Sequence, residues 1–234
     1  MSGEAVVGEQ FDAQFDRMLL KTSHPRVDMR LKSPFTALVV GPTGSGKTHA
    51  VFKMIENKDS ICTEPPVEVH YCYGAWQDAF EDMADRVIFH DGLIDLEKEM
   101  ENDGKARWLI IDDLMEETTG KSELNNLYTK HSHHRNVSVF FLSQNLFKEK
   151  NRTQSVNTHY MMLFKNPRDR QSISRLAQQA FPGSVQAVKE AYADATKEPY
   201  SFLLIDMKQE TPERCRLVGN FLSEDKPMIV YDVE

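Results

Sequence analysis

The sequence predicts an α/β fold in which helices flank a central, mostly parallel sheet. Short, wholly apolar runs recur along the chain, and such runs are typical of strands that are covered on both faces. Longer runs with apolar residues at helical spacing lie between them, so strand and helix alternate as they do around a parallel sheet. A glycine-rich stretch directly follows the first apolar run and opens the first helical run, which places it at the carboxyl end of a strand.

The composition suits one large globular domain. The chain has 234 residues, of which 40% are hydrophobic and 27% charged, and it can bury a substantial core. No apolar run approaches the roughly 20 residues of a membrane helix, so no membrane partner is expected. The net charge of −8 argues against a surface that coats nucleic acid, although a few basic loops could still contact DNA. Three isolated cysteines, Cys62, Cys72 and Cys215, indicate a reducing compartment rather than a disulfide framework or a zinc site.

The glycine-rich stretch, GPTGSGKT at residues 41–48, fits the pattern G-x-x-x-x-G-K-[ST] at every specified position. The N–H groups of such a loop, together with the positive end of the helix that follows, bind phosphate oxygens. Lys47 is predicted to reach the β- and γ-phosphates, and the Thr48 hydroxyl to bind Mg²⁺. ATP and Mg²⁺ are therefore the expected cofactors, and the predicted binding residues of the loop are Gly41, Pro42, Thr43, Gly44, Ser45, Gly46, Lys47 and Thr48.

The loop lies in the larger of two predicted parts of the chain. Residues 1–33 are predicted to be an N-terminal extension, and residues 34–234 one P-loop ATPase domain. In the extension, apolar residues from Phe11 to Leu19 share one face of a short helix, which either packs on the domain or docks on a neighbouring subunit. Strands of the domain are predicted at residues 35–40, 67–73, 87–90, 108–114, 137–142, 160–164, 201–207 and 216–221, and helices at 48–57, 77–83, 93–102, 122–130, 171–180 and 184–195.

Two acidic residues end the apolar run WLIIDDL at residues 108–114. Ligands of parallel sheets bind at the carboxyl ends of the strands, so both carboxylates are placed where a ligand is expected. Asp112 is predicted to hold Mg²⁺, and Asp113 to orient or deprotonate the attacking water. Acidic residues after a strand are also common as ordinary loop caps, and only the phosphate loop upstream makes the catalytic interpretation the stronger one.

A polar tripeptide, Ser143-Gln144-Asn145, ends the next apolar run. A side-chain amide at this position can hydrogen-bond both a γ-phosphate and an attacking water, so Gln144 is predicted to sense whether the phosphate is present. The segment HSHHRN precedes the same run. Its histidines, His131, His133 and His134, invite a metal interpretation, but no further ligand lies at a useful spacing, and a polar turn with a functional Arg135 is preferred.

Basic residues gather in two later loops. Lys148, Lys150 and Arg152 lie close to Phe147, and this loop either grips a DNA backbone or is simply a solvated charged loop. The second group, in the stretch KNPRDR, contains Arg168 and Arg170.

Several segments together resemble a known family. They are GPTGSGKT, YCYGAWQDAF, LIIDDL, HSHHRNVSVFFLSQNLF, LFKNPRDR and SFLLIDM, and they extend from about residue 34 to residue 221. The chain resembles genome-packaging ATPases of the FtsK/HerA superfamily, in particular the poxvirus-like packaging ATPases of Maverick/Polinton elements, virophages and related DNA viruses. The phosphate loop is specific only for nucleotide binding, and SHHRN followed by a strand and SQNLF is the part that narrows the resemblance to this family.

The resemblance implies more than the spacing does. It implies a RecA-like P-loop NTPase fold of the ASCE type, with the strand that ends at Gln144 between the phosphate-loop strand and the Asp112–Asp113 strand. It implies assembly into a homo-oligomeric ring, expected to be a hexamer, that hydrolyses ATP and threads double-stranded DNA into a capsid. Capsid proteins are then expected partners, inside an infected cell (cytoplasm or nucleus) or with the virion. Arg135 is the first candidate for an arginine finger that reaches a neighbour's ATP, and Arg168 and Arg170 are the second.

One departure and several alternatives accompany this resemblance. Many relatives outside this subgroup carry Asp-Glu where this chain has Asp112-Asp113, and the shorter carboxylate changes the reach of Asp113 toward a water. A related translocase or helicase that is not tied to packaging stays open as a function. So does a nucleotide-dependent assembly switch that turns over slowly. A P-loop kinase is weaker, because neither a lid-like arginine-rich insertion nor an acceptor site is evident.

Overall fold

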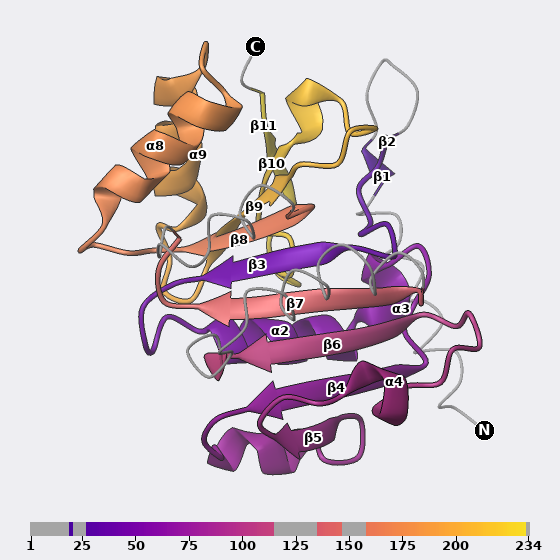
Figure 1. The fold of residues 1–234 in the computed structure, drawn as a ribbon. Coiled ribbons are helices and arrows are strands. Elements are labelled where there is room, and N and C mark those ends of the chain that lie inside the picture. The colour runs from indigo at the N-terminus through magenta and orange to yellow at the C-terminus, as the bar shows by residue number, and fades with distance from the viewer. Residues whose placement is uncertain (1–18, 21–26, 115–134, 147–157, 233–234) are drawn as a thin grey trace, which may run out of the picture.

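The centre of the molecule is a nine-stranded sheet with the strand order β11-β10-β9-β8-β3-β7-β6-β4-β5 (Figure 1). The computed structural model describes residues 19–20, 27–114, 135–146 and 158–232. The strands of the sheet are β3 (Thr36–Val40), β4 (Glu68–Tyr73), β5 (Ile88–Asp91), β6 (Arg107–Asp112), β7 (Val137–Ser143), β8 (Tyr160–Phe164), β9 (Phe202–Asp206), β10 (Leu217–Gly219) and β11 (Ile229–Tyr231).

The larger part of the sheet is parallel. All neighbours from β8 through β3, β7, β6 and β4 to β5 pair in parallel, whereas β9, β10 and β11 add to the β8 edge in antiparallel fashion. Strand β7 lies between β3 and β6, as the resemblance implied. The phosphate loop after β3, the acidic pair at the end of β6 and Gln144 after β7 therefore meet at one edge of the sheet.

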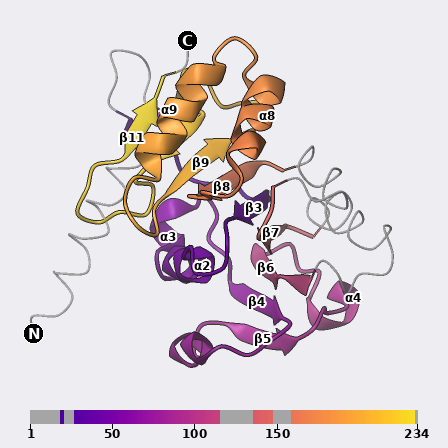
Figure 2. The same ribbon diagram turned by 90° about the vertical axis from the view of Figure 1, so that its left-hand side faces the viewer.

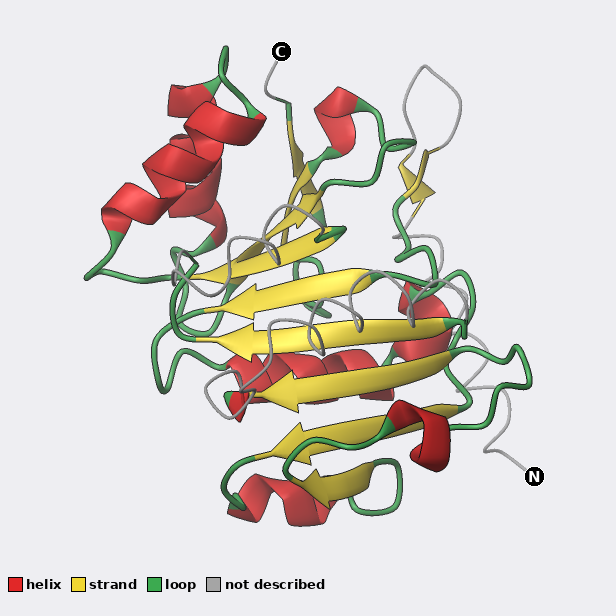
Figure 3. Cartoon of the chain, viewed as in Figure 1, coloured by secondary structure: helices red, strands yellow, loops and turns green. Residues whose placement is uncertain are grey.

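Helices cover both faces of the sheet, as Figure 2 shows and as the colouring by secondary structure makes plain in Figure 3. One face carries α2 (Lys47–Glu56), α3 (Lys58–Ile61) and the 3₁₀ helix η1 (Asp78–Met83), whose apolar residues join one core cluster. The other face carries α4 (Leu96–Glu99), α8 (Arg170–Ala180) and α9 (Val185–Ala195), whose apolar residues join a second cluster. A second 3₁₀ helix, η5 (Glu213–Cys215), precedes β10.

Strand β7 shows why the apolar runs of the sequence are continuous. Val139 and Phe141 point to the core under α8 and α9, and Phe140 and Leu142 to the core under α2. Every residue of β3, β7 and β8 is buried. A strand that is covered on both faces has no solvent side on which polar residues could alternate. The predicted fold class, α/β with a mostly parallel central sheet, is confirmed.

Residues 27–33 of the predicted extension lie against the domain. Strand β2 (Val27–Asp28) pairs with β1 (Leu19–Leu20), and Met29 and Leu31 are buried in the same cluster as Phe35. Leu31 forms an isolated bridge with Cys62. All three cysteines are buried and free. Within the described ranges, no helix has both the length and the apolar character needed to cross a membrane.

Some predicted elements differ from those observed. The helix expected at residues 93–102 is a single turn, Leu96–Glu99, because only Leu96 and Met100 are buried and the residues between them are exposed. The short strands β1, β2 and β11 were not expected, and the helix predicted to include Leu19 is wrong at that residue, which is in β1. The remainder of that helix, the helix at 122–130 and the basic loop with Lys148, Lys150 and Arg152 lie outside the described residues.

Candidate functional site

The phosphate loop turns sharply from β3 into α2, and two of its glycines are required by close contacts. A Cβ at Gly41 would lie 2.5 Å from Ser45 Oγ and 2.7 Å from Phe164 Cβ, so no larger residue fits there. Gly46 has a φ of +98°, which side chains rarely adopt, and its Cβ would lie 3.1 Å from Tyr200 Cβ. Helix α2 begins directly afterwards, with the Ala50 N–H donating to Gly46 O at 2.9 Å. The loop therefore lies at the amino end of a ten-residue helix, where anions bind.

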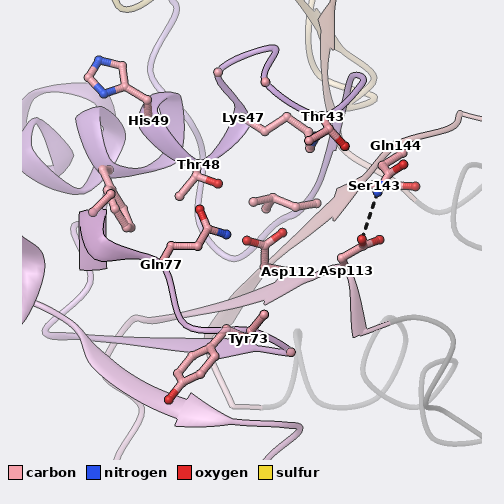
Figure 4. A pocket seen from close by; sticks show the side chains of 17 residues that line it. Thr43, Lys47, Thr48, His49, Tyr73, Gln77, Asp112, Asp113, Ser143 and Gln144 are labelled. Carbon is pink, nitrogen blue, oxygen red and sulfur yellow. Dashed lines mark hydrogen bonds between the residues drawn. The ribbon is translucent and has the colours of Figure 1, made fainter. Parts of the chain in front are cut away.

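A cavity of about 540 Å³ opens between this loop and the carboxyl ends of β4, β6 and β7 (Figure 4). Its size is within the roughly 300–1,000 Å³ typical of small-molecule sites. The cavity brings together eight of the residues predicted from the sequence to bind nucleotide or to catalyse, and five of these are Lys47, Thr48, Asp112, Asp113 and Gln144. Thr43, Gly44 and Gly46 of the loop also line it.

Lys47 is held close to its own loop. Its Nζ donates to Gly41 O at 2.7 Å and to Pro42 O at 3.2 Å. Burial lowers the pKa of Lys47, and the charges of Asp112 and Asp113 oppose that shift. The positive charge of a partly buried ammonium group is poorly compensated when its hydrogen-bond partners are only carbonyl groups. Such a group therefore binds a strong anion, such as a phosphate, favourably.

Asp112 is a partly buried carboxylate that a buried tyrosine supports. Tyr71, which is 0% exposed, donates its O–H to Asp112 Oδ2 at 2.7 Å. Burial raises the pKa of Asp112, while the hydrogen bond from Tyr71 and the charge of Lys47 lower it. Burial, followed by the charge of Asp112, raises the pKa of Tyr71, and a hydrogen bond with the Thr48 side chain opposes this. Tyr71 therefore remains a protonated donor, in contact with both predicted magnesium ligands.

Asp113 and Gln144 are linked across two neighbouring strands. Gln144 Nε2 donates to Asp113 Oδ2 at 3.0 Å, the contact drawn as a dashed line in Figure 4. Asp113 has a φ of +56°, in the left-handed region that aspartate adopts more readily than most residues. The chain therefore turns immediately after the partly buried Asp112. The two consecutive carboxylates consequently have different surroundings, one partly buried against Tyr71 and one exposed beside Gln144.

The donor set fits a nucleoside triphosphate with Mg²⁺. Thr48 and Asp112 supply the oxygen ligands that magnesium prefers, and Lys47 supplies a cation for phosphate. Ser45 Oγ is buried and has no hydrogen-bond partner among the described residues, so a polar atom of the loop remains for a ligand. The same part of the chain holds no group of three or more His, Cys, Asp or Glu side chains that could bind a metal without such a ligand. His131, His133 and His134 lie outside the described residues.

Arg135 lies away from this cavity. It lies two residues before β7, at the opposite end of that strand from Gln144. Its Nη1 donates to Leu96 O at 3.2 Å and to Met100 O at 3.4 Å. Arg168 and Arg170, in contrast, follow β8 at the same edge of the sheet as the phosphate loop, and both are exposed.

Tyr71 and Gln77 are polar residues of the site that were not predicted from the sequence. Tyr71 is within an apolar strand run, where periodicity indicates burial but gives no hydrogen-bond partner. Gln77 follows β4 and lines the cavity, and Figure 4 shows its amide near Thr48 and Asp112. The only feature of the sequence that could have indicated a role for Gln77 is its position after a strand of a parallel sheet. Many polar loop residues share that position.

Comparison with solved structures identifies the fold. The chain is similar to the cytoplasmic domain of the Thermomonospora curvata type VII secretion ATPase EccC, with a TM-score of 0.52 and 13% identity over 89% of this chain. It spans only 27% of that structure. A likeness to C. elegans PCH-2 covers 84% of this chain and 57% of that one at 11% identity, but its TM-score of 0.30 is too low to support an argument. No protein-family model matches the chain, and no curated protein matches it by sequence.

The strand order, the loop and the likeness to EccC together define the class. The chain has the RecA-like P-loop NTPase fold of the ASCE type, with β7 inserted between the phosphate-loop strand β3 and the acidic strand β6. This part of the expectation from the resemblance is confirmed.

Proposed function

We propose that the protein is an ATPase that converts ATP and water to ADP and phosphate. The observation that carries this proposal is the convergence of Lys47, Asp112 and Asp113 on one cavity beside a complete phosphate loop. A site that only bound a nucleotide would need the loop and a magnesium ligand. The second carboxylate, held by Gln144 beside the cavity, is a group that hydrolysis needs and binding does not.

The position of each residue in the site determines its proposed role. Magnesium, when bound, would neutralise charge on the phosphate oxygens. Lys47 and the loop N–H groups hold the β- and γ-phosphates, and Thr48 and Asp112 hold the cation. Tyr71 keeps the Asp112 carboxylate oriented through its 2.7 Å hydrogen bond. Asp113 and Gln144 align the attacking water, with Asp113 as the acceptor of its proton.

The finer part of the proposal is a motor that translocates double-stranded DNA into a capsid as a homo-oligomeric ring, expected to be a hexamer. The support is the resemblance of segments throughout the chain to packaging ATPases, above all the segment from His131 to Phe147. In a ring, each subunit contacts its two neighbours through two different surfaces. An arginine that enters a neighbour's nucleotide site should therefore lie on a different surface from the subunit's own nucleotide site. Arg135 lies at the far end of β7 from Gln144, and therefore away from the subunit's own site. Arg168 and Arg170 lie at the same edge of the sheet as that site, so Arg135 is the better candidate.

An ATPase titration with duplex DNA, run together with a measured oligomer mass, tests this finer proposal. We expect turnover to rise on addition of duplex DNA, and the rise to shrink with added salt, because phosphate contacts release counterions. Ring-sized assemblies should accompany the stimulated activity. Turnover that is independent of DNA would contradict the motor and leave the assembly switch as the better hypothesis. DNA-stimulated turnover without any effect of capsid proteins would favour a translocase that is not tied to packaging.

Asp113→Asn tests the chemistry independently of DNA. We expect turnover to fall about 10²- to 10⁴-fold, the usual contribution of a general base, while ATP affinity is retained. Asp91→Asn is a matched control, because Asp91 is also exposed at the carboxyl end of a parallel strand but does not line the cavity. Steady-state kinetics and ATP titration of both variants make the comparison. A turnover of Asp113→Asn equal to that of Asp91→Asn would remove Asp113 from the mechanism.

A further inference from the structure

A second cavity of about 290 Å³ borders the phosphate loop on its other side. It is lined by Gly44 and Ser45 of the loop, by Lys165 after β8 and by residues 197–201 before β9. Gly44 lines both cavities, so the two meet at the loop. The first cavity lies toward β7 and β6, and the second toward β8 and β9, on the opposite side of β3.

Tyr200 is the aromatic residue of this second cavity, and its backbone is unusual. It is 68% exposed and has a φ of +63°, a region that non-glycine residues rarely adopt. It occupies the third position of the turn Glu198–Ser201, where Pro199 precedes it and the Ser201 N–H donates to Glu198 O at 3.4 Å. Turns of this form usually carry glycine at that position. The turn alone therefore gives no reason for a tyrosine.

The ring of Tyr200 lies against the phosphate loop. An added Cβ at Gly46 would be 3.1 Å from both Cβ and Cδ1 of Tyr200. The strained backbone thus holds an exposed aromatic side chain at the rim of the loop, beside a cavity. Strained residues that persist at such places are a reason to ask what the side chain binds.

The direction of a bound nucleotide follows from the first cavity. If ATP is hydrolysed there, the γ-phosphate faces Asp113 and Gln144, on the β6 and β7 side of the loop. The α-phosphate and the nucleoside then extend to the other side, toward β8 and β9. The second cavity lies there, with the exposed Lys165 and Lys197 beside it and the ring of Tyr200 along its wall.

We propose that Tyr200 stacks on the base of the bound nucleoside triphosphate, and that Lys165 and residues 197–201 form the nucleoside subsite. This inference rests on the proposed function, since it takes its orientation from the hydrolytic cavity. Every base presents a π face, so stacking contributes affinity without selecting adenine. Tyr200 is accordingly a binding residue for nucleoside triphosphates in general, and its contribution is absent for a ligand that has phosphates but no base.

Isothermal titration calorimetry of the full chain tests the inference with three ligands, ATP, GTP and inorganic tripolyphosphate, each with Mg²⁺. Tyr200→Gly should weaken ATP and GTP binding about 5- to 100-fold, the usual effect of losing one stacked aromatic ring. Its tripolyphosphate affinity should equal that of the wild type. Tyr200→Phe keeps the ring and should keep the ATP affinity. Because glycine relieves the strained backbone, the unfolding midpoint of Tyr200→Gly should be at or above the wild-type value.

The outcomes separate this inference from the proposed function. Unchanged ATP affinity in Tyr200→Gly would overturn the stacking role, and so would an equal loss for ATP and tripolyphosphate, which would make Tyr200 a support of the loop. Lys47→Ala serves as the reference in the same titrations, because it should weaken both ligands. If Lys47→Ala changes neither, the proposed nucleotide site itself is wrong.

Discussion

Lys47→Ala should abolish tight nucleotide binding and reduce turnover by at least about 10²- to 10³-fold, the effect of removing one preorganised donor from a site of developing negative charge. The ammonium group of Lys47 already lies at the loop, 2.7 Å from Gly41 O, and among the described residues no second lysine or arginine lines the cavity. ATP titration and steady-state hydrolysis measure the two effects separately. Near-normal turnover would contradict the central claim about this site.

Lys53→Ala is the matched control for this variant. Lys53 carries the same charge on the same helix, and its Nζ forms a surface ion pair with Glu224 at 2.9 Å. Surface pairs of this kind contribute at most about 1 kcal/mol, and nucleotide binding should be unaffected. Loss of Lys47 should also leave the free energy of unfolding unchanged or higher, because burial lowers the pKa of Lys47 and the charged form is disfavoured in the folded state. A drop in the melting temperature would point instead to a structural role.

Arg135→Ala has the largest expected effect on turnover. If Arg135 stabilises the transition state in a neighbouring subunit, its loss should lower turnover by about 10³- to 10⁵-fold and leave ATP binding within each subunit intact. Mixing this variant with Asp113→Asn should restore part of the activity, since some interfaces then combine an intact arginine with an intact carboxylate. Turnover of the mixed assemblies, measured against each variant alone, provides the readout.

The intrasubunit contacts of Arg135 require a control. Its Nη1 bonds to Leu96 O and Met100 O hold the α4 segment in place, and a guanidinium has further donors for another partner. A purely structural role predicts a lower melting temperature and no rescue on mixing. Arg168→Ala and Arg170→Ala, made in parallel, test the arginines on the phosphate-loop side of the sheet. Rescue by either of these, and not by Arg135→Ala, would transfer the role to that residue.

The bounds of the central strands could be predicted closely because a strand that is buried on both faces has a continuous apolar sequence. Strand β8 has the predicted bounds, and β3 and β7 differ from them by one residue. The peripheral elements have a weaker apolar pattern in the sequence. Strand β11 has three residues, none of them fully buried, and its existence depends on pairing with β10 rather than on its own pattern.

The candidate site divides in the same way. Lys47 and Thr48 follow β3, and Asp112 ends β6, so each lies at the carboxyl end of its strand. Once the sheet is parallel, these ends meet at one edge, and the sequence predicts that the three residues lie close together. The contacts of Tyr71 and Tyr200 depend on the register between strands and on a turn far along the chain. Tyr71 meets Asp112 because β4 pairs with β6, placing Ile110 opposite Tyr71 and Asp112 opposite Tyr73. No pattern within either strand contains that information.

The partly buried carboxylate of Asp112 links the stability of the protein to its ligand. Its pKa is raised by burial, so the folded chain holds its proton more tightly than the unfolded chain, and folding becomes less favourable as pH rises through the raised pKa. Above the raised pKa the folded protein carries an unfavourable charge at Asp112, which a cation at Thr48 and Asp112 would compensate. On the proposed function, magnesium nucleotide binds only the folded state and increases its population by mass action. The amount of protein that survives quality control in a cell would then follow the local supply of nucleotide.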